Sequence, residues 1–161
     1  MRFKIVSLIA VAGVLAACGT APTSETASTS GSGEGQTATA KIVPGSAEDL
    51  KVNVGDRVFF AFDRYNLTAE ARHTLQQQAA WMAANSSVNV VIEGHCDERG
   101  TREYNLALGD RRANAVKDYL STLGVASSRV SSISYGKERP EDPASNETAW
   151  AKNRRGVTVV K

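Results

Sequence analysis

Residues 88–101, with the sequence VNVVIEGHCDERGT, decide the fold. Val88–Glu93 is mostly apolar and rich in β-branched residues, so it predicts a strand. Gly94–Gly100 is polar and bounded by glycines, which indicates a loop. Thr101 can cap a helix with its hydroxyl, and Glu103 then lies in the first turn. The stretch therefore predicts a strand, a short loop and a helix in direct succession.

The helix that begins after Thr101 should end near Gly124, because glycine is common just past helix ends. Apolar residues recur along it at helical spacing and predict its core-facing stripe: Leu106, Ala113, Val116, Leu120 and Leu123. Leu108 and Arg112 are four residues apart and share a second face beside that stripe. Arg112 is therefore expected next to the core.

A similar strand–helix unit precedes this one. Residues 57–62, RVFFAF, predict a strand that ends at the polar stretch 63–66. Thr68 can cap a helix that ends near residue 85, with the core positions Ala71, Leu75, Ala79 and Met82. Farther along, residues 129–135 and 156–160 predict two more strands, separated by a loop over 136–149. The predicted order is βαβαββ.

Two successive strand–helix units favour a parallel pair formed by strands 57–62 and 88–93, joined by a right-handed crossover. Both helices then cover one face of a mixed sheet, so the expected fold class is an α/β (α+β) two-layer sandwich. Ligands of parallel sheets bind beyond the carboxyl ends of the strands. The side chains expected there are Phe62 and Asp63 after the first strand, and His95, Cys96 and Asp97 after the second.

The strand ends and the second helix are predicted to form one pocket. Asp63, Asp97 and Arg112 would supply charges of both signs, and Phe62 and Leu108 would supply apolar walls. A carboxylate pairs with an ammonium and a guanidinium with a carboxylate, so the complementary ligand is a zwitterion with an amino-acid head. The alternative is a structural Asp–Arg salt bridge that closes the loop.

The run of His95, Cys96 and Asp97 also raises the hypotheses of a metal site and a thiol enzyme. Adjacent side chains in an extended segment point to opposite faces, so His95 and Cys96 would not share one ion. His73 is expected on the solvent face of the first helix, where it cannot activate Cys96. We therefore expect no enzyme, no metal site and no cofactor, and an inert, buried Cys96.

The amino-terminal segment has the pattern of an export signal. Arg2 and Lys4 precede an apolar run over residues 5–15, which is too short to span a bilayer as a helix. The residues that follow, Leu-Ala-Ala-Cys at 15–18, resemble the lipobox of bacterial lipoproteins, whose cysteine is lipidated. The alternative is an ordinary signal peptide with an incidental cysteine at Cys18.

We accordingly expect a signal peptide over residues 1–17, a lipidated and disordered periplasmic tether over 18–44, and a folded domain over 45–161. The tether is rich in Ser, Thr, Gly and Ala and cannot build a core. Lipid on Cys18 would anchor the chain to a membrane. Gly19 stands where inner-membrane retention signals carry Asp, so the resemblance implies the outer membrane.

Composition bounds the other possibilities. The 161 residues, 42% hydrophobic and 22% charged, suit one globular domain with appendages. The formal net charge is +2, and removal of residues 1–17 leaves 17 basic and 17 acidic residues. A neutral chain has no long-range field that gathers nucleic acid, so we expect no nucleic-acid partner.

Several spaced motifs resemble one known family. They are Gly94–Gly100, Tyr104-Asn105, Leu108–Ala113, Ser134–Glu138 and Asn153–Arg155. Together they resemble the OmpA-like carboxy-terminal domain family over about residues 57–160. Many members carry Thr where this chain has Cys96, and the cysteine is typical of the lipoprotein branch.

The resemblance implies a domain that binds peptidoglycan non-covalently and links the outer membrane to the cell wall. It implies that Asp97 and Arg112 hold the diaminopimelate of the stem peptide, with Asp63, Phe62 and Leu108 completing the site. Asn105 would order the loop rather than contact ligand. A partnership with the Tol system in cell division and envelope integrity is also implied, in particular with its periplasmic propeller protein.

Overall fold

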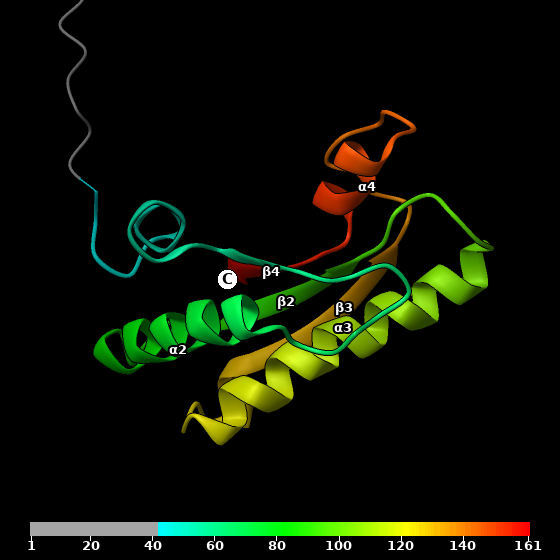
Figure 1. Ribbon diagram of the computed structural model, residues 1–161. Coiled ribbons are helices and arrows are strands. Elements are labelled where there is room, and N and C mark those ends of the chain that lie inside the picture. Colours follow the sequence, from blue (N-terminus) through cyan, green and yellow to red (C-terminus); the bar gives the residue numbers. More distant parts are fainter. Residues whose placement is uncertain (1–41) are drawn as a thin grey trace, which may run out of the picture. The chain divides into compact units, whose positions relative to one another are not determined.

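The structure is a computed structural model that describes residues 42–161. Its elements, in chain order, are α1 (Ala47–Asp49), a π-helical turn η1 (Leu50–Val54), β1 (Arg57–Phe59), α2 (Ala69–Ala84), β2 (Val90–His95), α3 (Arg102–Thr122), a 3₁₀ turn η2 (Ser127–Arg129), β3 (Val130–Gly136), α4 (Glu147–Asn153) and β4 (Arg155–Val160) (Figure 1). The expected signal peptide, the lipidation site Cys18 and nearly all of the tether lie outside the described residues. No helix between residues 42 and 161 has the length and apolar character that a membrane crossing requires.

The four strands form one mixed sheet in the order β1-β4-β2-β3. β2 pairs with β3 in parallel through α3, whereas β4 runs antiparallel to both β1 and β2. The prediction that strands 57–62 and 88–93 are neighbours is therefore wrong, because β4 lies between them. The two strands do run in the same direction, since each is antiparallel to β4. Strand–helix alternation indicates direction, but it does not say which later strand inserts between the pair.

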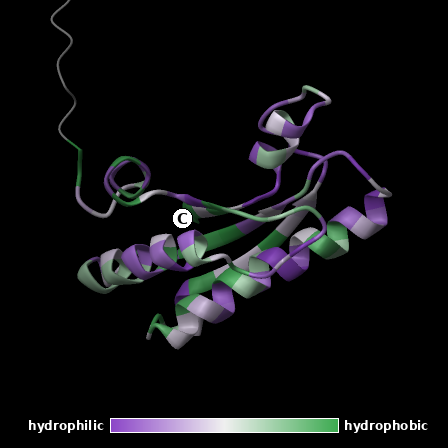
Figure 2. Cartoon of the chain, in the orientation of Figure 1, coloured by the Kyte–Doolittle hydropathy of each residue, from purple (hydrophilic) through white to green (hydrophobic). Residues whose placement is uncertain are grey.

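The two long helices lie on the same side of the sheet, as expected for a two-layer sandwich (Figure 1). Thr68 and Thr101 cap α2 and α3 with their side chains, each accepting a hydrogen bond from a backbone N–H three residues on. Hydrophilic and hydrophobic residues alternate along both helices (Figure 2). The core is formed by residues of the helices and the strands, including Leu75, Met82, Val90, Ile92, Ala113, Val116 and Leu120. The predicted fold class is confirmed.

Two members of the predicted stripe of α3 are not in the core. Leu106 is 46% exposed and Leu123 is 37% exposed. The backbone of Leu106 lies beside Gly136, the last residue of β3, so no further strand residue covers its side chain. Leu123 is already the C-cap residue of α3. Helical periodicity predicts the direction of a side chain but not where the sheet beneath it stops.

A glycine contact sets the position of α3 against the sheet. A Cβ atom added to Gly94 on β2 would lie 1.9 Å from the backbone oxygen of Gly109 on α3. Only a residue without a side chain permits this approach. Leu108, which precedes Gly109, and Arg112, about one turn further along α3, are therefore held close to the carboxyl end of β2.

Two short helices occur where the sequence analysis predicted either a loop or no element. α4 lies partly inside the predicted loop 136–149, and its N-cap Asn146 accepts a hydrogen bond from the backbone of Ala149. α1 is capped by Ser46. Helices this short depend on tertiary contacts rather than on periodicity, so sequence patterns indicate them poorly.

Candidate functional site

A pocket of about 200 Å³ opens where the loops after β1 and β2 meet α3. Its lining residues are Phe62, Asp63, Asp97, Arg99, Gly100, Tyr104, Asn105, Leu108 and Arg112. The structure thus brings together all five side chains that the sequence placed at the site.

Arg112 forms the floor of the pocket and is only 1% exposed. Its guanidinium donates hydrogen bonds to the carbonyl oxygens of Arg64 (2.8 Å), His95 (2.8 Å) and Ala61 (3.2 Å). These carbonyls belong to the loop after β1 and to the end of β2, so one side chain joins both loops to α3. Burial lowers the pKa of Arg112 below its ordinary value, although the group stays charged.

No carboxylate of the described chain lies within ion-pair distance of Arg112; its hydrogen bonds all go to neutral carbonyls. Asp97 is near enough to favour the charged form of Arg112 but does not pair with it. Buried charges are ordinarily paired, so a buried guanidinium without a direct ion pair is unusual.

Asp97 follows β2 on the same pocket and is 4% exposed. Its carboxylate pairs with Arg99 at 2.6 Å and with Arg154 at 3.3 Å, and it does not pair with Arg112. The alternative of a structural Asp–Arg salt bridge at this loop is present in part, because Asp97 pairs with Arg99 and Arg154, but Arg112 takes no part in it. Burial by itself would raise the pKa of the Asp97 carboxyl, but hydrogen bonds from Arg99 and Arg154 outweigh burial and lower it.

The rim of the pocket combines apolar and polar groups. Phe62 is 56% exposed on one side, whereas Leu108 on α3 is buried. Asp63 has a φ of 54°, in the left-handed region that non-glycine residues rarely adopt. Its carboxylate accepts a hydrogen bond from the hydroxyl of Tyr104. This bond raises the pKa of Tyr104 and links the loop after β1 to the first turn of α3.

Asn105 lies at the back of the pocket and fixes the loop after β2. Its side-chain amide donates to the carbonyl oxygens of Arg99 at 2.8 Å and Thr101 at 3.1 Å. Lys137 donates to two more carbonyls of this loop, those of Glu98 and Gly100. The loop that carries Asp97 is therefore held on both sides.

His95 and Cys96 do not form a reactive pair with solvent access. Both are buried, and the Cys96 thiol donates to the carbonyl oxygen of Asn105 at 3.3 Å. Burial raises the pKa of Cys96 to about 11 and lowers the pKa of His95 to about 4, so both groups are neutral near pH 7. Between residues 42 and 161 no three His, Cys, Asp or Glu side chains gather as metal ligands would.

Sequence reasoning missed Arg99, Tyr104 and Arg154 as site residues. Arg99 had a local signal, because an aspartate side chain can accept a hydrogen bond from the backbone N–H two residues on, as Asp97 does from Arg99. Arg154 reaches Asp97 from 57 positions away in the sequence. No local pattern indicates such a contact.

Comparison with known proteins identifies the family of this chain. The OmpA family matches residues 59–154, which include every pocket residue. A Mesorhizobium japonicum protein named peptidoglycan-associated lipoprotein is 47% identical over 99% of this chain and 90% of its own length. The protein of the same name from Pasteurella multocida is 43% identical over 96% of this chain and 97% of its own.

A solved structure is similar to this chain in both fold and sequence. The crystal structure of the peptidoglycan-associated lipoprotein from Burkholderia pseudomallei has a TM-score of 0.64 and 42% identity, covering 66% of this chain and 90% of that one. The family match covers more than half of the 161 residues, and the full-length relatives exceed 40% identity. The chain therefore belongs to the OmpA family.

Proposed function

We propose that this chain is an envelope lipoprotein whose folded domain binds peptidoglycan non-covalently and catalyses no reaction. The names of its relatives support association with peptidoglycan. Within the wall, the ligand proposed for the pocket is the side-chain centre of diaminopimelate in the stem peptide, which carries one ammonium and one carboxylate.

The observation that carries this proposal is the buried Arg112, which forms no ion pair with any carboxylate between residues 42 and 161. A ligand carboxylate that enters the pocket supplies the missing counter-charge, and a guanidinium binds a carboxylate through two parallel hydrogen bonds. A neutral ligand would make no ion pair with Arg112. The positive charge of the Arg112 guanidinium therefore favours an anionic group at the inner end of the ligand.

Asp97 supplies the second half of the recognition. Its carboxylate lies in the same cavity as Arg112 but pairs with Arg99 and Arg154, so the cavity presents separate negative and positive charges to a ligand that carries both signs. Phe62 and Leu108 enclose the carbon chain between these ends, and Asp63 closes the rim. Loss of one charged partner should weaken binding by about 2–5 kcal/mol, because the opposite ligand charge is then buried unpaired.

Co-sedimentation with purified peptidoglycan tests this proposal. Asp97→Asn removes the charge with little change of shape, and Asp142→Asn is the matched control, since Asp142 lies outside the pocket and pairs with Lys152 at the surface. We expect the parent and the control to pellet with the wall, and Asp97→Asn to remain in the supernatant with an unchanged circular dichroism spectrum. A folded Asp97→Asn protein that pellets like the parent would refute the assignment.

The membrane link and the Tol partnership are further parts of this proposal. Lipid on Cys18 contributes about 0.8 kcal/mol per buried CH₂, and several acyl chains give stable anchoring in the outer membrane. With the wall as its second attachment, the chain would join the two layers and act with the Tol system in envelope integrity and cell division. Competition between the Tol propeller protein and a muropeptide tests whether the partner uses the same surface, and unhindered joint binding would reject overlap.

A further inference from the structure

Arg99 occupies the position at which a ligand ammonium would meet Asp97. Its terminal nitrogen lies 2.6 Å from one carboxylate oxygen, and its Nε lies 3.2 Å from the other. The backbone N–H of Arg99 also donates to Asp97, at 3.1 Å. Both oxygens of the carboxylate are thus already engaged by a cation of the same chain.

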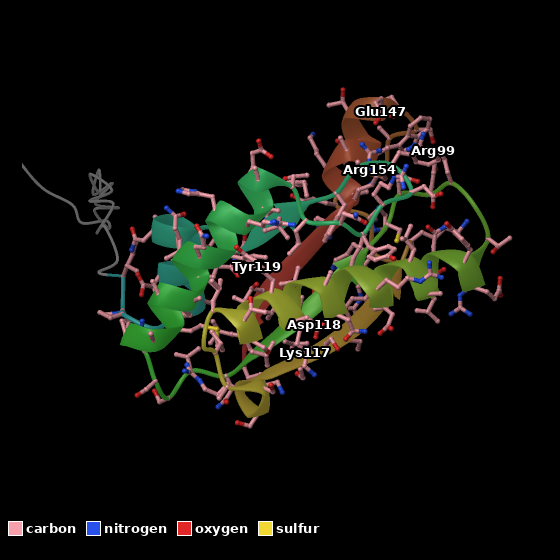
Figure 3. The ribbon with its side chains drawn as sticks, turned by 60° about the horizontal axis from the view of Figure 1, so that its bottom comes forward. Arg99, Lys117, Asp118, Tyr119, Glu147 and Arg154 are labelled. Atoms are coloured by element: carbon pink, nitrogen blue, oxygen red, sulfur yellow. The ribbon has the colours of Figure 1, made fainter. Side chains whose placement is uncertain are left out.

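Two aromatic rings hold the Arg99 guanidinium in this place. It lies 4.0 Å from the ring centroid of Phe62, in the loop after β1, and 4.2 Å from that of Trp150, on α4. Glu147, in the first turn of α4, lies 3.7 Å from it. Figure 3 shows Arg99, Glu147 and Arg154 gathered at this end of the domain. The contacts are those of a cation held between the faces of two aromatic rings.

The two arginines on Asp97 differ in freedom. Arg154 has a side chain 9% exposed, and it also binds the carbonyl oxygen of Phe60 and the carboxylate of Glu147. The Arg99 side chain is 30% exposed and lines the pocket itself. Arg99 is therefore the more exposed of the two arginines and the one a ligand in the pocket would meet, whereas Arg154 is buried and bonded to the backbone.

We propose that Arg99 is a specificity-determining residue that competes with the ligand ammonium for Asp97, an inference that rests on the proposed function of the pocket. Exchange of one cation for another on Asp97 brings little net gain. A ligand that carries only an ammonium is therefore rejected. A ligand that also delivers a carboxylate to Arg112 gains a second ion pair and displaces Arg99.

Two probes that differ only in carboxylates test this competition. They are meso-diaminopimelate and 1,5-diaminopentane, which is the same carbon chain with both amines and neither carboxylate. NMR titrations of the purified chain would follow the backbone amide of Asp97. The variants are Arg99→Gln, Trp150→Leu, which removes one of the two rings that hold the guanidinium, and Arg102→Gln. Arg102 is an exposed arginine paired with Glu138 outside the pocket, so its variant controls for the loss of one positive charge.

In the parent and in Arg102→Gln we expect diaminopimelate to bind much more tightly than diaminopentane. In Arg99→Gln the affinity for diaminopentane should rise about tenfold relative to that for diaminopimelate, and in Trp150→Leu about threefold. An unchanged ratio in folded Arg99→Gln, or a fall in affinity for both probes, would overturn the competition and indicate that Arg99 contacts the ligand directly or is only structural.

The same titrations distinguish failure of the Arg99 competition from failure of diaminopimelate binding by the pocket. If the parent binds no diaminopimelate but Arg99→Gln gains diaminopentane at Asp97, Arg99 is still the competitor while the pocket serves another ligand. If neither probe binds Arg99→Gln, both ideas are refuted.

Discussion

Replacement of Arg112 by alanine should destabilise the domain before any question of binding arises. The substitution removes three hydrogen bonds and leaves the carbonyl oxygens of Ala61, Arg64 and His95 without their donor. Hydrogen bonds to charged groups contribute about 1.5–3 kcal/mol each. Loss of an uncompensated buried charge offsets part of this sum, so we expect a net loss of about 3–5 kcal/mol.

Urea denaturation followed by circular dichroism measures the loss directly. A domain of this size should also melt roughly 10–15 °C lower. Arg112→Lys keeps the positive charge but cannot reach all three carbonyls, so its loss should be smaller, about 2–3 kcal/mol. Arg111→Ala is the matched control, because Arg111 is the exposed neighbour on α3 and should change the free energy of unfolding by less than about 0.5 kcal/mol.

A folded Arg112→Ala protein within about 1 kcal/mol of the parent would refute this reasoning. The three carbonyls would then be satisfied by water, and Arg112 would be free to act on ligand alone. If the loss is as large as expected, wall binding by Arg112→Ala has to be measured at a temperature where the variant is folded.

Three other outcomes follow from the buried groups. Because burial lowers the pKa of His95 to about 4, the folded state resists a proton that the unfolded chain accepts near pH 6.5. The free energy of unfolding should therefore fall by about 3 kcal/mol between pH 6.5 and 4, as measured by urea titrations. This loss should be absent in His95→Gln and retained in the control His73→Gln, because His73 is exposed. Gly94→Ala should lower the melting temperature by at least 10 °C, since its Cβ would overlap the backbone of Gly109; a shift below 3 °C would show that α3 can move away freely. Cys96 should resist iodoacetamide at pH 8 in the folded protein and react fully in urea, as mapped by mass spectrometry; rapid labelling without urea would contradict its burial.

The sequence predicted most elements because their signals are local. The caps Thr68 and Thr101 start α2 and α3 at the expected residues, and the runs around 90–95 and 155–160 form the expected strands. The neighbour of β1 could not be predicted in the same way. Insertion of β4 between β1 and β2 depends on pairing between strands about 100 residues apart, for which local periodicity holds no information.

The sequence predicted which residues line the pocket, but not which groups those residues bind. Asp97 and Arg112 follow from their places at a strand end and on a helix face. Their partners do not, because Arg112 binds backbone carbonyls, which every sequence possesses, and Asp97 binds Arg154 across the fold. An Asp–Arg salt bridge was one of two alternatives at this site, and the structure forms it between Asp97 and both Arg99 and Arg154, while Arg112 has separate partners.

Because Asp97 and Arg112 have different partners, variants of Arg112 and of Arg99 test different properties of the pocket. Arg112 joins the two loops and α3, so the same side chain holds the pocket together and supplies its buried positive charge. Loss of wall binding in an Arg112 variant therefore cannot distinguish a missing ligand contact from a collapsed pocket. Arg99 lies at the opening, partly exposed, and its side chain bonds to no backbone carbonyl. Because its removal should change ligand preference while the loops stay joined, Arg99 gives the cleaner test of recognition, and Arg112 the cleaner test of how the pocket is built.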